Sequence, residues 1–377
     1  MTDGKWTAVL SPGASAAALA RIASAARPHR VPHRVRPDLA GGGAGLALAF
    51  HWLDRGLPGR GWDAFARGYL AAAIRGYQRL GASPGLFGGA AGLAFAAWSV
   101  SHDGSAPGCS ALHDRVVREA FARARELGDG PPPPARAVDV VSGLTGAGAY
   151  LLCWSDEPRA ADALRAVLTV LTRTGARTGT RRPGETSDPG LAHGLSGPLA
   201  LLSLALGEGV AVPGQRRAVG RLADMLNACR TDDAWGPNWP GTANGHGGRP
   251  VRASWCRGSP GTARALWLAG SALGERPLRD LAVRALKAVH LRPPGERRID
   301  GDPGLCHGLA GLLQITSRFA HDTGDPALAS AAGRLAAAPF PANAGPGFLD
   351  GAAGVVLAVL SAATDAEPEW DRALLLA

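Results

Sequence analysis

Cysteine and histidine side chains stand just before glycines at three points in the second half of the chain. His193 directly precedes a glycine, Cys256 lies two positions before another, and Cys306 and His307 precede a third. Two thiols and one imidazole suit Zn²⁺, and three protein ligands leave the open fourth position of a catalytic zinc site. The sequence therefore predicts a zinc site of Cys256, Cys306 and His307, provided that the fold brings them together.

The other cysteines, Cys109, Cys153 and Cys229, lie away from these glycines and are expected to be buried or idle thiols. Five cysteines in 377 residues do not indicate a disulfide framework. We find no signal-peptide pattern, and Arg, Pro or Gly interrupts every apolar segment that could cross a bilayer. We therefore expect a cytoplasmic protein without transmembrane segments. In the reducing cytoplasm, cysteine next to histidine indicates a metal site or a nucleophile rather than a disulfide bond.

The formal net charge of +9 raises the question of a nucleic-acid partner. The arginines are scattered, and no run of five or six basic residues occurs. The denser clusters, at 29–36 and at Arg181-Arg182, are interpreted as solvated surface. We predict no nucleic-acid binding, although a basic surface can attract an acidic peptide.

A Gly-x-x-Gly element recurs seven times and organises the chain. Its copies start roughly 43 to 64 residues apart, a range in which one repeat holds about two helices. Each copy precedes a run such as 46–50 or 198–202, which is apolar nearly all round, as a buried helix must be. Arg-rich amphipathic stretches such as 114–127 and 277–290 lie between these runs. The copies are 42–45, 89–92, 143–146, 194–197, 258–261, 308–311 and 351–354.

Buried helices that alternate with amphipathic ones indicate an inner ring wrapped by an outer ring. We predict an all-α fold, an α/α toroid (barrel) of seven helical hairpin repeats, in which residues 1–377 form a single domain. Strand signals are weak, and the stretches 131–134 and 235–250 are interpreted as loops. If every repeat presents its glycine turn at the same end of the inner ring, the residues beside the turns converge.

Several of these segments resemble the lanthionine synthetase C-like (LanC) family. Segments 190–197, 254–258 and 305–311 look like its three signature blocks, and 348–354 is similar to its final repeat. The resemblance covers nearly the whole chain in the right order. It implies a toroid around a zinc ion and cyclisation of lanthipeptide precursors.

The resemblance also implies roles for individual residues. One departure is Arg257, which stands where the family often has an aromatic residue. Alternative interpretations are a helix cap for Asp139, a solvated charge for Arg252 and structural packing for His193. The family's zinc ligands match Cys256, Cys306 and His307, its proposed acid/base matches His193, an active-site acid matches Asp139, and a basic residue of the site matches Arg252.

The expected activity is a zinc-dependent Michael-type addition of cysteine thiols to dehydroalanine or dehydrobutyrine, which forms (methyl)lanthionine rings in a precursor peptide. The chain has no room for a dehydratase domain, so a separate dehydratase and an exporter are candidate partners, with the protein peripheral to the membrane in such a complex. Two alternatives stay open: an enzyme that adds glutathione to dehydrated residues, and a non-catalytic peptide-binding scaffold. A terpenoid cyclase-like toroid would need acidic clusters that are not found.

Overall fold

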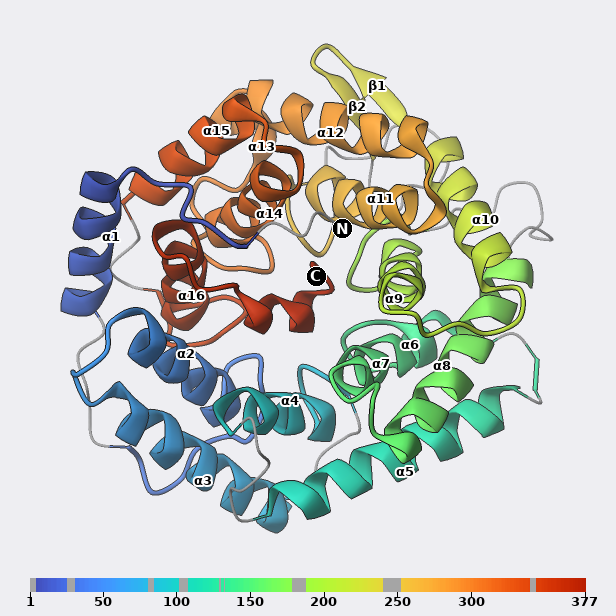
Figure 1. Ribbon diagram of the computed structural model, residues 1–377, viewed down its shortest axis with the longest axis horizontal. Helices are drawn as coiled ribbons and strands as arrows, with labels where there is room; N and C mark the ends of the chain where they lie inside the picture. The colour runs from blue at the N-terminus through green and yellow to red at the C-terminus, as the bar shows by residue number, and fades with distance from the viewer. Residues whose placement is uncertain are drawn as a thin grey trace.

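The computed structural model describes residues 5–25, 31–80, 85–101, 108–128, 130–131, 133–177, 188–239, 252–339 and 344–377. Seven helices of this part of the chain surround a common centre (Figure 1), and each contacts the next until the last meets the first. These helices are buried on nearly all sides, because they pack against both ring neighbours and an outer helix. They are α2 (Gly43–Gly56), α4 (Ala90–Val100), α7 (Leu144–Leu152), α9 (Ser196–Gly207), α11 (Ser259–Leu273), α14 (Leu309–Thr323) and α16 (Ala352–Ala363).

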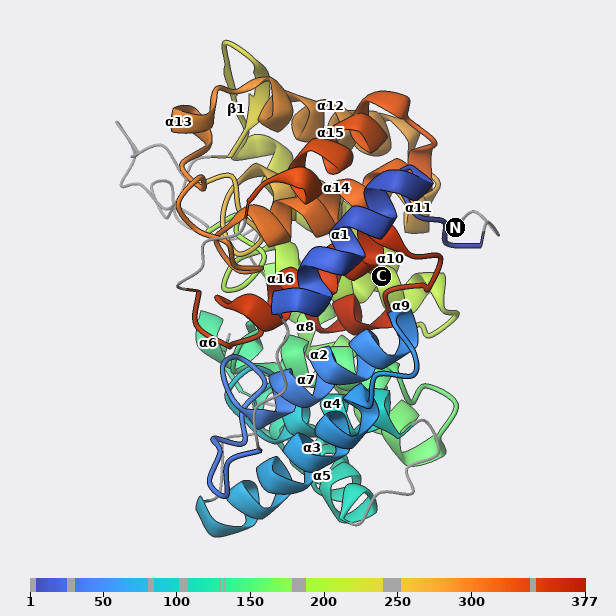
Figure 2. The same ribbon diagram turned by 90° about the vertical axis from the view of Figure 1, so that its left-hand side faces the viewer.

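A second ring of amphipathic helices covers the first. Six of its members follow their inner partners along the chain as antiparallel hairpins, whereas α1 comes from the other end of the chain and packs on α16 (Figure 2). The predicted toroid of inner and outer helices is therefore confirmed, and the two ends of the chain build its seventh pair. The outer helices are α1 (Pro12–Ala25), α3 (Trp62–Leu80), α5 (Cys109–Gly128), α8 (Pro158–Arg177), α10 (Gln215–Ala228), α12 (Arg276–Leu291) and α15 (Pro326–Ala337).

Each Gly-x-x-Gly copy marks the start of an inner helix, and its second glycine lies against a backbone carbonyl six residues earlier. A methyl group on Gly311 would lie 2.0 Å from the oxygen of Leu305, and one on Gly354 would lie 2.1 Å from that of Phe348. The residue that supplies this carbonyl is always apolar and is fully buried in each copy. These residues are Leu39, Leu86, Val140, Leu191, Trp255, Leu305 and Phe348.

A small hairpin departs from the prediction that 235–250 is a loop. Strands β1 (Thr231–Asp233) and β2 (Gly236–Asn238) pair antiparallel, with Asp233 opposite Gly236. Asp233 Oδ1 accepts hydrogen bonds from the backbone N–H groups of Trp235 and Gly236, which stabilises the tight turn. Residues 240–250 lie outside the described residues, as do Pro132 of the predicted loop 131–134, residues 29–30 and the pair Arg181-Arg182.

The remaining elements are two short helices, α6 (Ala135–Val138) and α13 (Pro294–Arg297), and the 3₁₀ helix η2 (Glu369–Leu374). η2 contacts α4 and α7, and the C-terminus lies near the centre of the ring in Figure 1. In the described part of the chain, no helix is both long enough and apolar enough to cross a bilayer.

Candidate metal centre

Backbone hydrogen bonds link the seven glycine turns into a closed belt around one end of the inner ring. In nearly every turn, the residue whose backbone N–H and C=O make these hydrogen bonds lies two positions before the first glycine of its Gly-x-x-Gly copy. Because Cys256 and Cys306 both occupy this position in adjacent repeats, the fold itself makes them neighbours. The N–H to O=C bonds run from Ala40 to Phe87 (3.0 Å), Phe87 to Val141 (3.3 Å), Val140 to Ala192 (3.0 Å), Ala192 to Cys256 (3.2 Å), Cys256 to Cys306 (3.3 Å), Cys306 to Leu349 (2.9 Å) and Leu349 to Ala40 (2.9 Å).

The residue directly before the first glycine is polar and chemically distinctive in four consecutive turns. These residues are His193, Arg257, His307 and Asp350; the other three turns have Gly41, Gly88 and Ser142. Equivalent positions of adjacent repeats share one rim, so the belt order also gives the order of these four side chains. One sector of the rim therefore carries two imidazoles, a guanidinium and a carboxylate.

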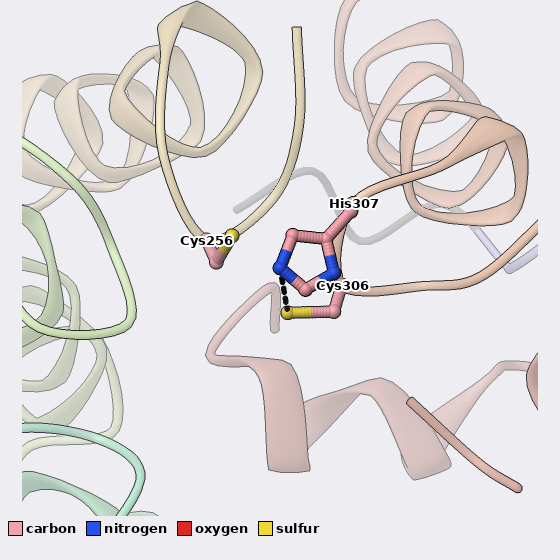
Figure 3. A group of neighbouring side chains, drawn as sticks. All are labelled: Cys256, Cys306 and His307. Atoms are coloured by element: carbon pink, nitrogen blue, oxygen red, sulfur yellow. Dashed lines mark hydrogen bonds between the residues drawn. The ribbon is translucent and has the colours of Figure 1, made fainter. Parts of the chain in front are cut away.

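Cys256, Cys306 and His307 meet within this sector (Figure 3). Their donor atoms all lie within 4.8 Å of one another, and Nε2 of His307 is 3.7 Å from Sγ of Cys306. In a tetrahedral zinc site, with bonds of about 2.3 Å to sulfur and about 2.0 Å to nitrogen, neighbouring ligand atoms lie about 3.5 Å apart. The observed spacing fits such an ion after a small contraction.

The ionisation of the cluster also favours a cation. Hydrogen bonds from Cys306 and His307 lower the pKa of Cys256 to about 4. The Cys256 thiolate, together with burial, raises the pKa of Cys306. Hydrogen bonds to Asp350 and Cys256 raise the pKa of His307 to about 10. The Cys256 thiolate thus opposes ionisation of Cys306, and a cation bound between the two sulfurs would relieve that repulsion.

Contacts on two sides hold the Cys256, Cys306 and His307 cluster in place. Nδ1 of His307 lies 3.2 Å from Oδ1 of Asp350, to which it can donate, so that Nε2, the nitrogen that faces the sulfurs, would be the ligand atom once a metal replaces its proton. On the other ligand turn, the buried Trp255 donates its Nε1–H to the carbonyl of Leu374 at 2.9 Å. The side chain next to Cys256 in the sequence is thus anchored to the C-terminal segment.

His193 and Asp139 form a pair on neighbouring turns of the belt. Nδ1 of His193 lies 2.7 Å from Oδ2 of Asp139, while Oδ1 of Asp139 accepts from the backbone N–H groups of Ser142 and Gly143 at 2.8 Å each. Asp139 therefore both stabilises its own turn and orients the imidazole. The hydrogen bond to Asp139 raises the pKa of His193, against burial and the charge of Arg257, which lower it.

Comparison with known proteins identifies the family. A family model described as "Lanthionine synthetase C-like protein" matches residues 33–375. The chain belongs to the lanthionine synthetase C-like family. A solved structure of nisin cyclase superimposes on this LanC-like chain with a TM-score of 0.77 and 19% sequence identity, covering 96% of each chain, which shows a shared fold. No curated protein matches the sequence at a significant level.

Other predicted residues of the LanC-like chain lie as follows. Nη1 of Arg252 lies 3.3 Å from Oδ2 of Asp302, so its charge is already paired. Cys109, Cys153 and Cys229 form no disulfide bond. Burial raises the pKa of Cys153 to about 12, as expected for an idle thiol.

Two residues near the metal site had no role assigned from the sequence. Asp350 contacts His307, and the buried Ser254 places Oγ 3.7 Å from Sγ of Cys256 while donating to the carbonyl of Arg257. Asp350 could have been found from the repeat register, because it holds the same position before its glycine as His193 and His307. Nothing in the repeat distinguishes Ser254.

Proposed function

We propose that this LanC-like chain is a zinc-dependent lanthipeptide cyclase that adds cysteine thiols to dehydroalanine or dehydrobutyrine of a precursor peptide and forms thioether rings. The observation that carries the proposal is the convergence of Cys256, Cys306 and His307 beside the His193–Asp139 pair. A nucleophile-activating site and a proton donor then lie on adjacent turns of one rim.

Cys256, Cys306 and His307 would hold the zinc. Bound there, zinc would supply the Lewis acidity that ionises a substrate thiol. His193 serves as general acid to the substrate Cα through Nε2, since Asp139 occupies Nδ1. Asp139 keeps the imidazole in one tautomer and favours its protonated form.

The direct test uses a model peptide with one dehydroalanine and one cysteine. Ring formation leaves the mass unchanged and consumes the thiol, so alkylation with N-ethylmaleimide separates cyclised from linear peptide in a mass spectrum. The zinc-loaded wild type is expected to remove the alkylatable thiol faster than buffer containing the same zinc. Cys306→Ala is expected to match the buffer.

The same assay separates the alternative activities. A peptide mass increased by one glutathione, formed only when glutathione is added, would indicate intermolecular thiol addition. Peptide binding without any loss of thiol would indicate a non-catalytic scaffold.

The domain organisation, partner proteins and location of the enzyme follow from the same proposal. Because the ring closes on itself, we propose that residues 1–377 act as one domain. The dehydrated precursor would come from a separate dehydratase, in a cytoplasmic complex with an exporter at the membrane. Co-purification of the tagged chain with those proteins tests this arrangement.

A further inference from the structure

Arg257 stands between the two histidines of the rim. It directly precedes the first glycine of the fifth copy, as His193 does in the fourth and His307 in the sixth. The belt joins these three turns in order, through Ala192 to Cys256 and through Cys256 to Cys306. A substrate that reaches from the metal ligands to His193 therefore passes the turn of Arg257.

The side chain of Arg257 extends toward the turn of His193. A methyl group on Gly190 would lie 3.3 Å from Cγ of Arg257, so the arginine stem packs on the segment that leads to His193. Its charge also acts on His193, whose pKa it lowers against the opposite effects of Asp139 and Asp188. Arg257 is exposed at the rim, where a substrate can reach it.

Arg257 and Arg252 differ in what occupies their guanidinium groups. Arg252 forms an ion pair with Asp302, whereas Arg257 makes no ion pair with any residue that the structure describes. A guanidinium without an ion-pair partner does not have to give up an existing ion pair when it binds a developing anion. Of the two cations, Arg257 is therefore the one that lies on the turn between the two histidines and that has no ion pair among the described residues to give up.

We propose that Arg257, rather than Arg252, stabilises the enolate oxygen that forms on the substrate during thiol addition. This inference rests on the proposed function. The lone pair of the substrate sulfur forms the S–Cβ bond, the Cα=Cβ π pair becomes a double bond between Cα and the carbonyl carbon, and the C=O π pair moves onto oxygen, which becomes the enolate oxygen. The carbonyl then re-forms as Cα takes a proton from the His193 imidazolium. The proton lost by the thiol returns His193 to its protonated form, so no further reactant is consumed. Arg257 donates to the anionic oxygen while that charge exists.

The test compares Arg257→Ala, Arg257→Lys and Arg252→Ala in the thiol-loss assay, with Arg276→Ala on the outer surface of α12 as the matched control. Arg257→Ala is expected to lower kcat about 100-fold, with KM for the peptide little changed and zinc content equal to wild type. Arg257→Lys keeps the charge but loses the planar fork, so it should retain more activity. Millimolar guanidinium should partly restore Arg257→Ala, and NMR titration should show a higher pKa of His193 in that variant.

Three kinetic results would overturn the inference alone: wild-type kcat in Arg257→Ala, a loss confined to KM, or a greater loss of kcat in Arg252→Ala. An unchanged pKa of His193 in Arg257→Ala would also do so, because the guanidinium would then lie too far from the reacting atoms. Failure of the wild type to consume thiol would instead reject the proposed function, and this inference with it.

Discussion

Nδ1 of His193 lies 2.7 Å from Oδ2 of Asp139, a carboxylate that is 2% exposed and whose other oxygen accepts two backbone N–H groups of its own turn. This fixed acceptor gives the imidazole one orientation and one tautomer, with Nε2 left for chemistry. The two interpretations of Asp139 concern different oxygens: Oδ1 accepts from the turn before α7, whose N-cap is Gly143, whereas Oδ2 contacts His193, on which the proposed catalytic role rests.

The first prediction concerns pH. In the proposed mechanism the protonated His193 delivers the proton, so the rate should fall as pH rises through its raised pKa. Asp139→Asn removes the anionic acceptor, so the pKa of His193 should fall by about one unit or more and the falling limb should move to lower pH. The pH profile of kcat for both proteins measures this shift. A falling limb at the same pH in both would show that Asp139 does not tune the catalytic acid.

The second prediction separates proton transfer from metal binding. His193→Ala is expected to keep its zinc and to lose about 10²- to 10⁴-fold in ring formation, the usual contribution of a general acid. Elemental analysis and the thiol-loss assay on the same preparation measure both quantities. Cyclisation at the wild-type rate would remove His193 from the mechanism.

The third prediction concerns Asp350. Because it accepts from Nδ1 of His307, Asp350→Asn should weaken zinc binding about 10- to 100-fold, as expected when the partner of a ligating histidine is altered. Competition with a chromophoric chelator measures the affinity. Asp280→Asn, on the outer helix α12, is the matched control and should bind zinc as the wild type does. Equal affinities for all three proteins would mean that the contact does not orient His307.

The fourth prediction tests the close packing of the glycine turns. Gly311→Ala places a methyl group 2.0 Å from the carbonyl of Leu305 and should lower the free energy of unfolding by about 1–3 kcal/mol. Gly220→Ala is the control, since its methyl group meets no atom within 4 Å inside helix α10; there alanine should stabilise by about 0.5–1 kcal/mol. Urea unfolding of the two variants should therefore give shifts of opposite sign.

Much of the fold could be predicted from the sequence because its signals are local. Each glycine turn meets the same steric requirement, so the Gly-x-x-Gly spacing reports the repeat and places Cys256 and Cys306 at one rim. The seventh pair could not be predicted in this way, because α1 and α16 meet only through closure of the ring. The β1–β2 hairpin escaped notice because strands of three residues show no alternating pattern.

Site residues could likewise be predicted where they lie at the repeated glycine turns, and not elsewhere. Cys256, Cys306 and His307 converge, and Asp139 contacts His193, because all five lie at or near repeat-equivalent turns. Arg252 lies farther from its glycine, and its pairing with Asp302 depends on a segment 50 residues away, which no local pattern reports.

The most direct test of the account is the zinc content of the purified protein and its ligand variants, measured by elemental analysis. We predict about one zinc per chain in the wild type and in Cys229→Ala, a thiol away from the rim, and almost none in Cys256→Ala, Cys306→Ala or His307→Ala. A wild type that binds no zinc, or ligand variants that keep it while the folded ring is intact, would contradict the account.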